Sequence, residues 1–176
     1  EQKNINRLNL GNFYCIGEFQ KKLMEKKHNI KKINLIGSPT LSIYKELKPK
    51  NIQKKFEICY ISQWTPLSLI NKNNLVDPKI INILKLEKNL KKFLQKYSYS
   101  IVFALRSSEK DEEYEYFNQN FGERGDIHIR KNYFDTYELI ENSNVTITGW
   151  STCGYETFAD NNKVLFNPYN SKDLQL

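Results

Sequence analysis

Small and hydroxyl-bearing residues lie near the end of the chain, between an apolar run and a helix-like stretch. The apolar run is Val145–Thr148, and the helix-like stretch begins at Thr152. Where a helix begins, backbone N–H groups and the positive end of the helix dipole converge, and side-chain hydroxyls add donors. The turn therefore predicts a phosphate-binding site, although Ser151 or Thr152 could equally serve as a simple helix cap. The predicted site comprises Gly149, Trp150, Ser151, Thr152 and Cys153.

Two further polar loops follow apolar runs. Arg106 follows Ser100–Leu105, and its planar, permanently charged guanidinium suits a diphosphate; Ser107 adds a hydroxyl. Gln63 follows Phe56–Ser62, where the first loop of a domain would face a nucleotide. In an open parallel sheet such loops lie at the carboxyl edge, where ligands bind. The alternative for Arg106 is a surface arginine at the end of a strand.

Two aromatic residues stand beside these loops. Tyr133 directly precedes the helix-like stretch Phe134–Asn142, so it could border a base pocket, and Trp64 is next to Gln63. Packing is the more common role of such large side chains, and it is the alternative for both; Tyr133 is kept as a candidate nucleotide-binding residue.

Several classes of site are not expected. His28 and His128 have no Cys, His or Asp at ligand spacing, so no metal site is predicted. No Walker loop, GxGxxG fingerprint or Ser-His-Asp elbow occurs in the sequence. Cys15, Cys59 and Cys153 are widely spaced and odd in number, which argues against a disulfide framework and favours a reducing cytoplasm.

The charge is uneven along the chain. Residues 1–100 hold 20 Lys and Arg against 7 Asp and Glu, whereas residues 101–176 hold 7 against 13, within a formal net charge of +7. The basic half favours an anionic partner: nucleotide phosphates, nucleic acid or the inner face of a membrane. Lysines solvated on helix surfaces explain the same excess. No apolar run approaches the roughly 18–20 residues of a membrane span, and no signal-peptide pattern occurs. A cytoplasmic protein is therefore expected, with peripheral association with the inner face of the membrane as an open alternative.

The elements that must position these residues alternate along the chain, as in βαβ units. Apolar runs with no polar alternation, such as FEICYI and IVFAL, are typical of strands covered on both faces. The predicted strands are Phe13–Ile16, Ile33–Ile36, Phe56–Ser62, Ser100–Leu105, Asp126–Ile129, Val145–Thr148 and Val164–Phe166. The predicted helices are Glu18–Lys27, Leu41–Leu47, Pro78–Tyr97, Lys110–Asn118, Phe134–Asn142 and Thr152–Asp160, with Asp77 capping the longest.

These elements predict an α/β fold: a Rossmann-like parallel sheet of about five or six strands with helices on both faces. The main domain is expected at residues 50–176. Residues 1–49 have a short strand, a basic helix, a second strand and the turn signal Gly37-Ser38-Pro39. We interpret this segment as the end of a preceding domain and an interdomain linker.

The stretch Tyr137–Asn167, YELIENSNVTITGWSTCGYETFADNNKVLFN, resembles the C-terminal domain of GT-B glycosyltransferases. More narrowly, it is similar to bacterial surface-carbohydrate biosynthesis proteins and to the CDP-glycerol glycerophosphotransferase and capsular polysaccharide transferase group. The segments YCIGEF, INLIGSPTL and ICYISQ also fit the surface-carbohydrate proteins, and Gly37-Ser38-Pro39 matches the interdomain loop. The resemblance implies that the chain is one half of a GT-B fold.

The resemblance also implies roles for particular residues. Ser151 and Thr152 match the hydroxyl pair that holds the donor phosphates, and Glu156 matches the acidic residue that hydrogen-bonds the donor ribose. A first-turn Glu favoured by the helix dipole is the alternative for Glu156. The sequence departs from the family at Leu105-Arg106-Ser107-Ser108, where related transferases often carry a His-Pro. This departure puts the identity of the donor in doubt.

The function expected from the resemblance is transfer of a group from a nucleotide-activated donor during synthesis of a bacterial surface or capsular polysaccharide. The donor is expected to be CMP-, CDP- or UDP-linked and to need no further cofactor. The acceptor would be a glycan or a lipid-linked glycan at the inner membrane face. The alternatives are a nucleotide-sugar 2-epimerase, whose turn is normally richer in glycine, and a non-catalytic nucleotide- or nucleic-acid-binding domain. No nucleic-acid motif is present, so nucleic acid is not the expected partner.

Overall fold

The computed structural model describes residues 7–48, 52–64, 78–106 and 111–167. The chain divides into two compact units, an N-terminal unit at Glu1–Leu47 and a C-terminal unit at Lys48–Leu176. The boundary expected near residue 50 falls beside residues 49–51, which lie outside the described ranges. That the first unit completes a preceding domain remains a prediction.

The N-terminal unit is a short βαβ arrangement followed by a helix. It comprises β1 (Asn9–Cys15), α1 (Glu18–Lys27), β2 (Asn29–Leu35) and α2 (Pro39–Leu47). Strands β1 and β2 pair in parallel and form a two-stranded sheet. The hydroxyl of Ser38 accepts a hydrogen bond from the third residue of α2, so the predicted turn here also begins a helix.

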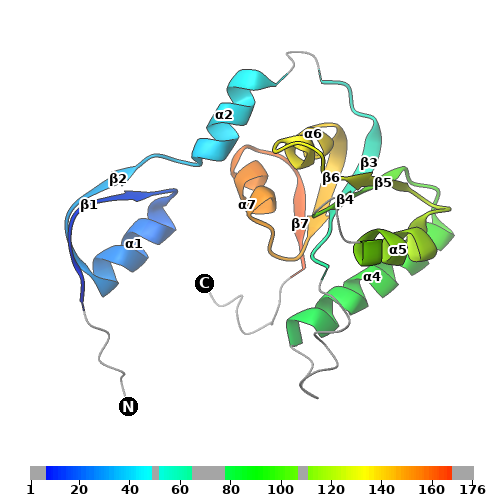
Figure 1. Ribbon diagram of the computed structural model, residues 1–176, viewed down its shortest axis with the longest axis horizontal. Coiled ribbons are helices and arrows are strands. Elements are labelled where there is room, and N and C mark those ends of the chain that lie inside the picture. The colour runs from blue at the N-terminus through cyan, green and yellow to red at the C-terminus, as the bar shows by residue number, and fades with distance from the viewer. Residues whose placement is uncertain (1–6, 49–51, 65–77, 107–110, 168–176) are drawn as a thin grey trace. The chain divides into compact units, whose positions relative to one another are not determined.

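The C-terminal unit is an α/β fold around a five-stranded parallel sheet, as the sequence predicts (Figure 1). The strand order is β5-β4-β3-β6-β7, and every neighbouring pair is parallel. The strands are β3 (Phe56–Ile61), β4 (Ile101–Leu105), β5 (Asp126–Ile129), β6 (Ser143–Thr148) and β7 (Val164–Phe166). The helices are α4 (Pro78–Lys96), α5 (Asp111–Phe121), α6 (Asp135–Glu141) and α7 (Thr152–Ala159).

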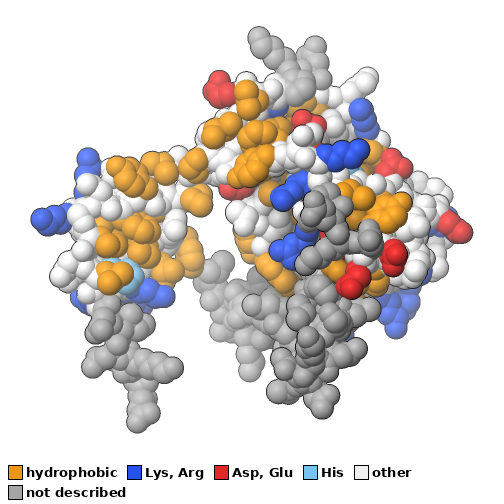
Figure 2. All heavy atoms as spheres, viewed as in Figure 1, with side chains coloured by type: hydrophobic (Ala, Val, Ile, Leu, Met, Phe, Trp, Pro, Cys, Tyr) orange, Lys and Arg blue, Asp and Glu red, His pale blue; other side chains and the backbone are white. Residues whose placement is uncertain are grey.

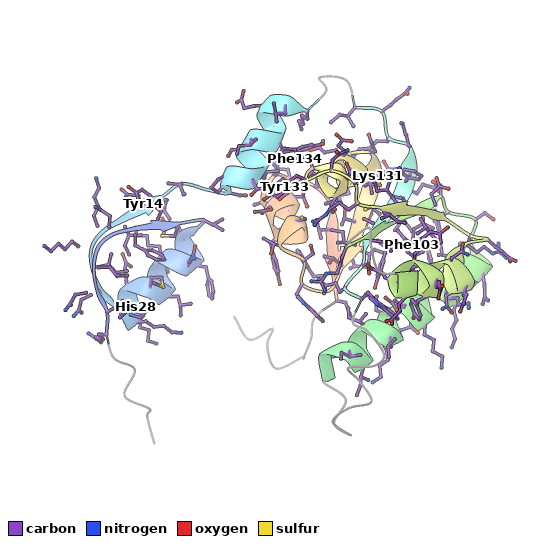
Figure 3. The ribbon with its side chains drawn as sticks, viewed as in Figure 1. Tyr14, His28, Phe103, Lys131, Tyr133 and Phe134 are labelled. Carbon is purple, nitrogen blue, oxygen red and sulfur yellow. The ribbon has the colours of Figure 1, made fainter. Side chains whose placement is uncertain are left out.

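The two faces of the sheet are covered by different helices, because successive side chains of a strand point to opposite faces. On β4, Ile101, Phe103 and Leu105 pack with side chains of α4 and α5, whereas Val102 and Ala104 pack with side chains of α6. All five residues of β4 are buried, which explains why this strand is apolar throughout. Phe103 is labelled in Figure 3 beside the helices that cover it.

Some element boundaries differ from the sequence prediction. The β1, β2 and β6 strands begin earlier than expected, because polar residues at their start continue the pairing. Ser143 is one example: it pairs with Phe56, it is buried, and its hydroxyl donates a 2.7 Å bond to the carbonyl of Leu139. The predicted cap Asp77 lies outside the described residues.

Helix α7 packs closely on the end of β6, and Gly154 permits this approach. A Cβ at Gly154 would lie 2.6 Å from Cγ2 of the buried Thr148. Gly154→Ala is therefore expected to lower the free energy of unfolding by about 1–3 kcal/mol, because the added methyl overpacks a filled space. Urea denaturation measures the change.

The matched control is the same substitution in a Thr148→Ser background, which lacks the Cγ2 methyl. In the Thr148→Ser background, Gly154→Ala should lower the free energy of unfolding by clearly less than in the wild type. An equal cost in both backgrounds would show that the contact with Thr148 is not the cause.

Within the described residues, no helix combines the length and the apolar character that a membrane crossing requires.

Candidate functional site

A cavity of about 700 Å³ opens at the carboxyl edge of the C-terminal unit's sheet, where the ends of β3, β4, β5 and β6 meet. This is the edge at which open α/β sheets bind ligands. The lining residues are Ile61, Ser62, Gln63, Ala104, Leu105, Arg106, Arg130, Thr136, Trp150, Ser151, Thr152 and Cys153.

The structure brings together most of the predicted ligand contacts. Ser107 lies outside the described residues, and Gly149 neighbours the cavity without lining it. Glu156 and Tyr133 are also absent from the lining. The predicted residues that line the cavity are Gln63, Arg106, Trp150, Ser151, Thr152 and Cys153.

The turn between β6 and α7 is held against the loop after β3. The backbone N–H of Trp150 donates a 3.0 Å bond to Oε1 of Gln63. A Cβ at Gly149 would lie 2.6 Å from the same oxygen, so glycine allows the two loops to meet. Gln63 therefore shapes the turn as well as lining the cavity.

Ser151 is the residue that precedes α7, but its side chain makes no capping hydrogen bond. The interpretation of Ser151 as a simple side-chain cap is therefore wrong for this structure. The first N–H groups of an α-helix have no carbonyl partner within the helix. At α7 these groups include those of Thr152 and Cys153, two residues that line the cavity.

Two arginines give the cavity its charge. Arg106 follows β4, and its Nη1 donates a 3.3 Å bond to the carbonyl oxygen of Trp64. Arg130 follows β5. Both guanidinium groups are permanently charged, and the described lining contains no acidic side chain. This charge is suited to an anion.

Arg130 and Thr136 were not predicted as site residues. Arg130 directly follows the apolar end of β5, the same signal that identified Arg106 after β4. Thr136 is the second residue of α6, so an anion near Arg130 would also meet this hydroxyl. A polar residue directly after a predicted parallel strand is expected at the carboxyl edge of the sheet, and this pattern identifies Arg130 as well.

Asp135 fixes the loop that carries Arg130. Its carboxylate accepts bonds from the backbone N–H groups of Lys131 at 2.7 Å and Asn132 at 2.9 Å, and it lies 3.3 Å from Nε2 of His128. Burial alone raises the pKa of the Asp135 carboxyl, but these donors outweigh it and hold the pKa below its ordinary value. The loop is therefore anchored by an ionised carboxylate.

Glu156, the predicted ribose ligand, lies on α7 and accepts a hydrogen bond from the hydroxyl of Tyr137. A role for Glu156 in ribose binding remains a prediction.

Cys153, which lines the cavity, is not activated as a nucleophile. Burial raises the pKa of its thiol, and the carboxylate of Glu156 adds to the rise. The raised pKa disfavours the thiolate, which is the reactive form of cysteine.

Tyr133, predicted at the border of a base pocket, is 68% exposed. Its ring packs edge-on against Phe134, with centroids 5.1 Å apart (Figure 3). Figure 2 shows that other hydrophobic side chains also reach the viewed surface of this unit, among Lys and Arg side chains. The aromatic residue that lines the cavity is instead Trp150, which is 39% exposed.

Two buried carboxylates lie on the α4–α5 side of the sheet, and neither was predicted. Glu87 is 2% exposed and accepts bonds from the hydroxyls of Tyr60 at 2.8 Å and Tyr116 at 2.7 Å. Glu113 is 3% exposed and accepts a bond from Ser62, which lines the cavity. Helical phase could have revealed both: each lies four residues from a core residue on its own helix, Glu87 after Ile83 and Glu113 before Phe117.

Glu87, in α4, makes the free energy of unfolding depend on pH. Burial raises the pKa of Glu87 above its ordinary value of 4.5, so just above that pH the folded protein binds more protons than the unfolded chain. The free energy of unfolding contributed by Glu87 therefore falls as pH rises from 4.5 to the raised pKa, by at most about 1.4 kcal/mol per pH unit.

Glu87→Gln should make this decline shallower, as measured by urea unfolding from pH 4.5 to neutrality. A decline as steep as that of the wild type would contradict the assignment to Glu87.

Among the described residues, no group of three or more His, Cys, Asp and Glu side chains is placed to hold a metal ion. The arrangement can instead bind an anion with two guanidinium groups, the N–H groups that begin α7 and the hydroxyls around them. Comparison with known proteins gives no further assignment: no protein-family model matches the chain, and no curated protein matches it significantly.

Proposed function

We propose that the C-terminal unit binds the phosphates of a nucleotide-activated donor, as the donor-binding half of a glycosyltransferase. The observation that carries the proposal is the cavity at the carboxyl edge of the sheet, with Arg106, Arg130 and the start of α7 on its walls. Two positive charges and free helix-end donors suit a diphosphate better than a neutral sugar alone.

The transferase class rests on the resemblance of Tyr137–Asn167 to GT-B donor domains. The location of Ser151 and Thr152 in the cavity supports it, since the resemblance gives these two residues the donor phosphates. We propose the cellular role that this resemblance implies, which is synthesis of a bacterial surface or capsular polysaccharide. The acceptor would be a glycan or a lipid-linked acceptor at the cytoplasmic face of the inner membrane.

The proposed contribution to the reaction is stabilisation of the leaving group. As the bond from the transferred carbon to the phosphate oxygen breaks, negative charge grows on the departing nucleoside phosphate. Arg106, Arg130 and the N–H groups of Thr152 and Cys153 would meet that charge. Preorganised donors of this kind lower the barrier because they need no reorganisation as the charge develops.

Calorimetric titration of the chain with CMP, CDP, UDP and GDP tests the proposal. Cytidine or uridine diphosphate is expected to bind, and Ser151→Ala/Thr152→Ala should weaken binding about tenfold, through lost hydrogen bonds worth about 1 kcal/mol or more in total. The matched control is Ser98→Ala, which removes an exposed hydroxyl just before the amino end of β4.

Binding of a nucleoside diphosphate that is lost in the double variant and kept in Ser98→Ala would support the phosphate site. Selectivity for cytidine would favour the CDP-glycerol and capsule type of transferase, and selectivity for uridine a UDP-sugar enzyme. No binding of any nucleotide would contradict the proposal.

A further inference from the structure

Glu113 lies behind the cavity and joins two of its walls. Its carboxylate accepts a 2.5 Å bond from the hydroxyl of Ser62, in the loop after β3. It also accepts from the backbone N–H of Arg106, in the loop after β4, at 3.3 Å to Oε2 and 3.4 Å to Oε1. Ser62 and Arg106 both line the cavity, whereas Glu113 does not.

The contacts around Glu113 close into a ring. The hydroxyl oxygen of Ser62 accepts a 3.1 Å bond from the backbone N–H of Trp64. The carbonyl of Trp64 in turn accepts from Nη1 of Arg106, at 3.3 Å. The ring therefore runs from Glu113 through Ser62, Trp64 and Arg106 back to Glu113. It fixes the backbone of Arg106 and the direction of its guanidinium together.

We propose that Glu113 is a positioning residue for the anion site: it holds the loops after β3 and β4 in the arrangement that presents Arg106 to a phosphate. This inference rests on the proposed function and deepens it, because it makes ligand affinity depend on a group that never touches the ligand.

The chemistry of the ring calls for a carboxylate at this position. Ser62 O–H and Arg106 N–H are both donors that point at Glu113, and a carboxylate offers only acceptors. A glutamine has the same shape but only one acceptor oxygen. If its NH₂ group faces Arg106, two donors oppose each other; if it faces Ser62, the Ser62 hydroxyl must accept instead, and its own proton loses its partner. Since Glu113 is 3% exposed, water cannot easily supply the missing bond, and the link between the two loops is weakened.

Glu87 supplies a matched control, since it is a second glutamate buried on the same side of the sheet. It is 2% exposed, and the side-chain hydroxyls it accepts from belong to Tyr60 and Tyr116, neither of which lines the cavity. Glu87→Gln should therefore disturb the core without removing an acceptor from the ring that holds Arg106.

The experiment is calorimetric titration with CDP, or with UDP if the wild type selects uridine, of five proteins: the wild type, Glu113→Gln, Glu87→Gln, Arg106→Ala and the double variant Glu113→Gln/Arg106→Ala. We expect Glu113→Gln to weaken CDP binding about tenfold, Glu87→Gln to change it less than about twofold, and Glu113→Gln to cost little in the Arg106→Ala background. Hydrogen exchange of the Arg106 backbone amide should be faster in Glu113→Gln than in the wild type, and it should be unchanged in Glu87→Gln.

Each outcome decides a different point. If the wild type binds CDP and Glu113→Gln binds it equally well, this inference is overturned and the proposed function stands. If Glu87→Gln loses as much affinity as Glu113→Gln, or the effects of Glu113→Gln and Arg106→Ala simply add, Glu113 is not acting through Arg106. If the wild type binds neither CDP nor UDP, both proposals fall.

Should Glu113→Gln not fold, Ser62→Ala cuts the ring at another point. It should also speed exchange of the Arg106 amide, and an unchanged rate in folded Ser62→Ala would overturn the inference.

Discussion

Replacing Arg106 and Arg130 together with alanine is expected to weaken CDP binding by about 100-fold or more. Each guanidinium would make charge-assisted hydrogen bonds to phosphate oxygens, worth about 1.5–3 kcal/mol apiece, and 1.4 kcal/mol corresponds to about tenfold in affinity. The two residues come from loops after neighbouring strands, β4 and β5, so one diphosphate can meet both. Isothermal titration measures the loss.

Arg124→Ala is the matched control for this experiment. Arg124 is exposed, precedes β5 and so lies at the amino edge of the sheet, away from the cavity. Its removal takes away one positive charge, as either single arginine variant of the cavity would, and should leave CDP affinity within about twofold, apart from a small change in salt dependence. Equal losses in Arg124→Ala and the double variant would mean that only general charge attracts the nucleotide.

Phe103→Ala is expected to cost the largest amount of stability, about 3–5 kcal/mol. Phe103 is fully buried on β4, and its ring centroid lies 4.6 Å from that of Phe121 and 5.4 Å from that of Phe117. Removal of the ring leaves a cavity between the sheet and α5 that the tightly packed neighbours cannot fill. Urea denaturation followed by circular dichroism measures the change in the free energy of unfolding.

Phe158→Ala provides the comparison, because the Phe158 side chain is 58% exposed and packs edge-on against Phe166. We expect a cost below about 1 kcal/mol, since little of its surface leaves water on folding. Similar costs for the two variants would contradict the placement of Phe103 at the centre of the core.

Much of the fold could be predicted because burial on both faces leaves a clear trace in the sequence. The IVFAL run predicts a central strand, and β4 is indeed buried along its whole length between two helix layers. Strand starts were predicted less well. Ser143 carries no apolar signal, yet it continues β6, because its hydroxyl finds a partner in the preceding helix.

The position of the site could be predicted from one rule, that polar residues after parallel strands share an edge. Gln63, Arg106 and Ser151 lie in three different loops, and the structure brings all three to one cavity. The same rule points to Arg130, which directly follows β5.

The sequence could not show which polar groups already have partners. Glu156 reads as a ligand residue in the resemblance, but the structure gives it the hydroxyl of Tyr137, which is 19 residues away in sequence. Helical phase can place Glu113 on the buried side of its helix, but it cannot show that the carboxylate accepts a hydrogen bond from Ser62. Such pairings depend on tertiary packing between elements, which no local pattern encodes.

The most direct test of nucleotide binding in this cavity is a titration of the isotopically labelled chain with CDP, followed by backbone amide NMR. If the cavity holds the phosphates, the largest shifts will fall on the amides of Ser151–Gly154, Arg106 and Arg130, where the donors converge. The separate hollow between α4 and α5, which Lys91 and Arg124 line, should be unaffected. Shifts confined to that hollow, or no shifts at millimolar CDP or UDP, would contradict the assignment of the strand-end cavity as the nucleotide site.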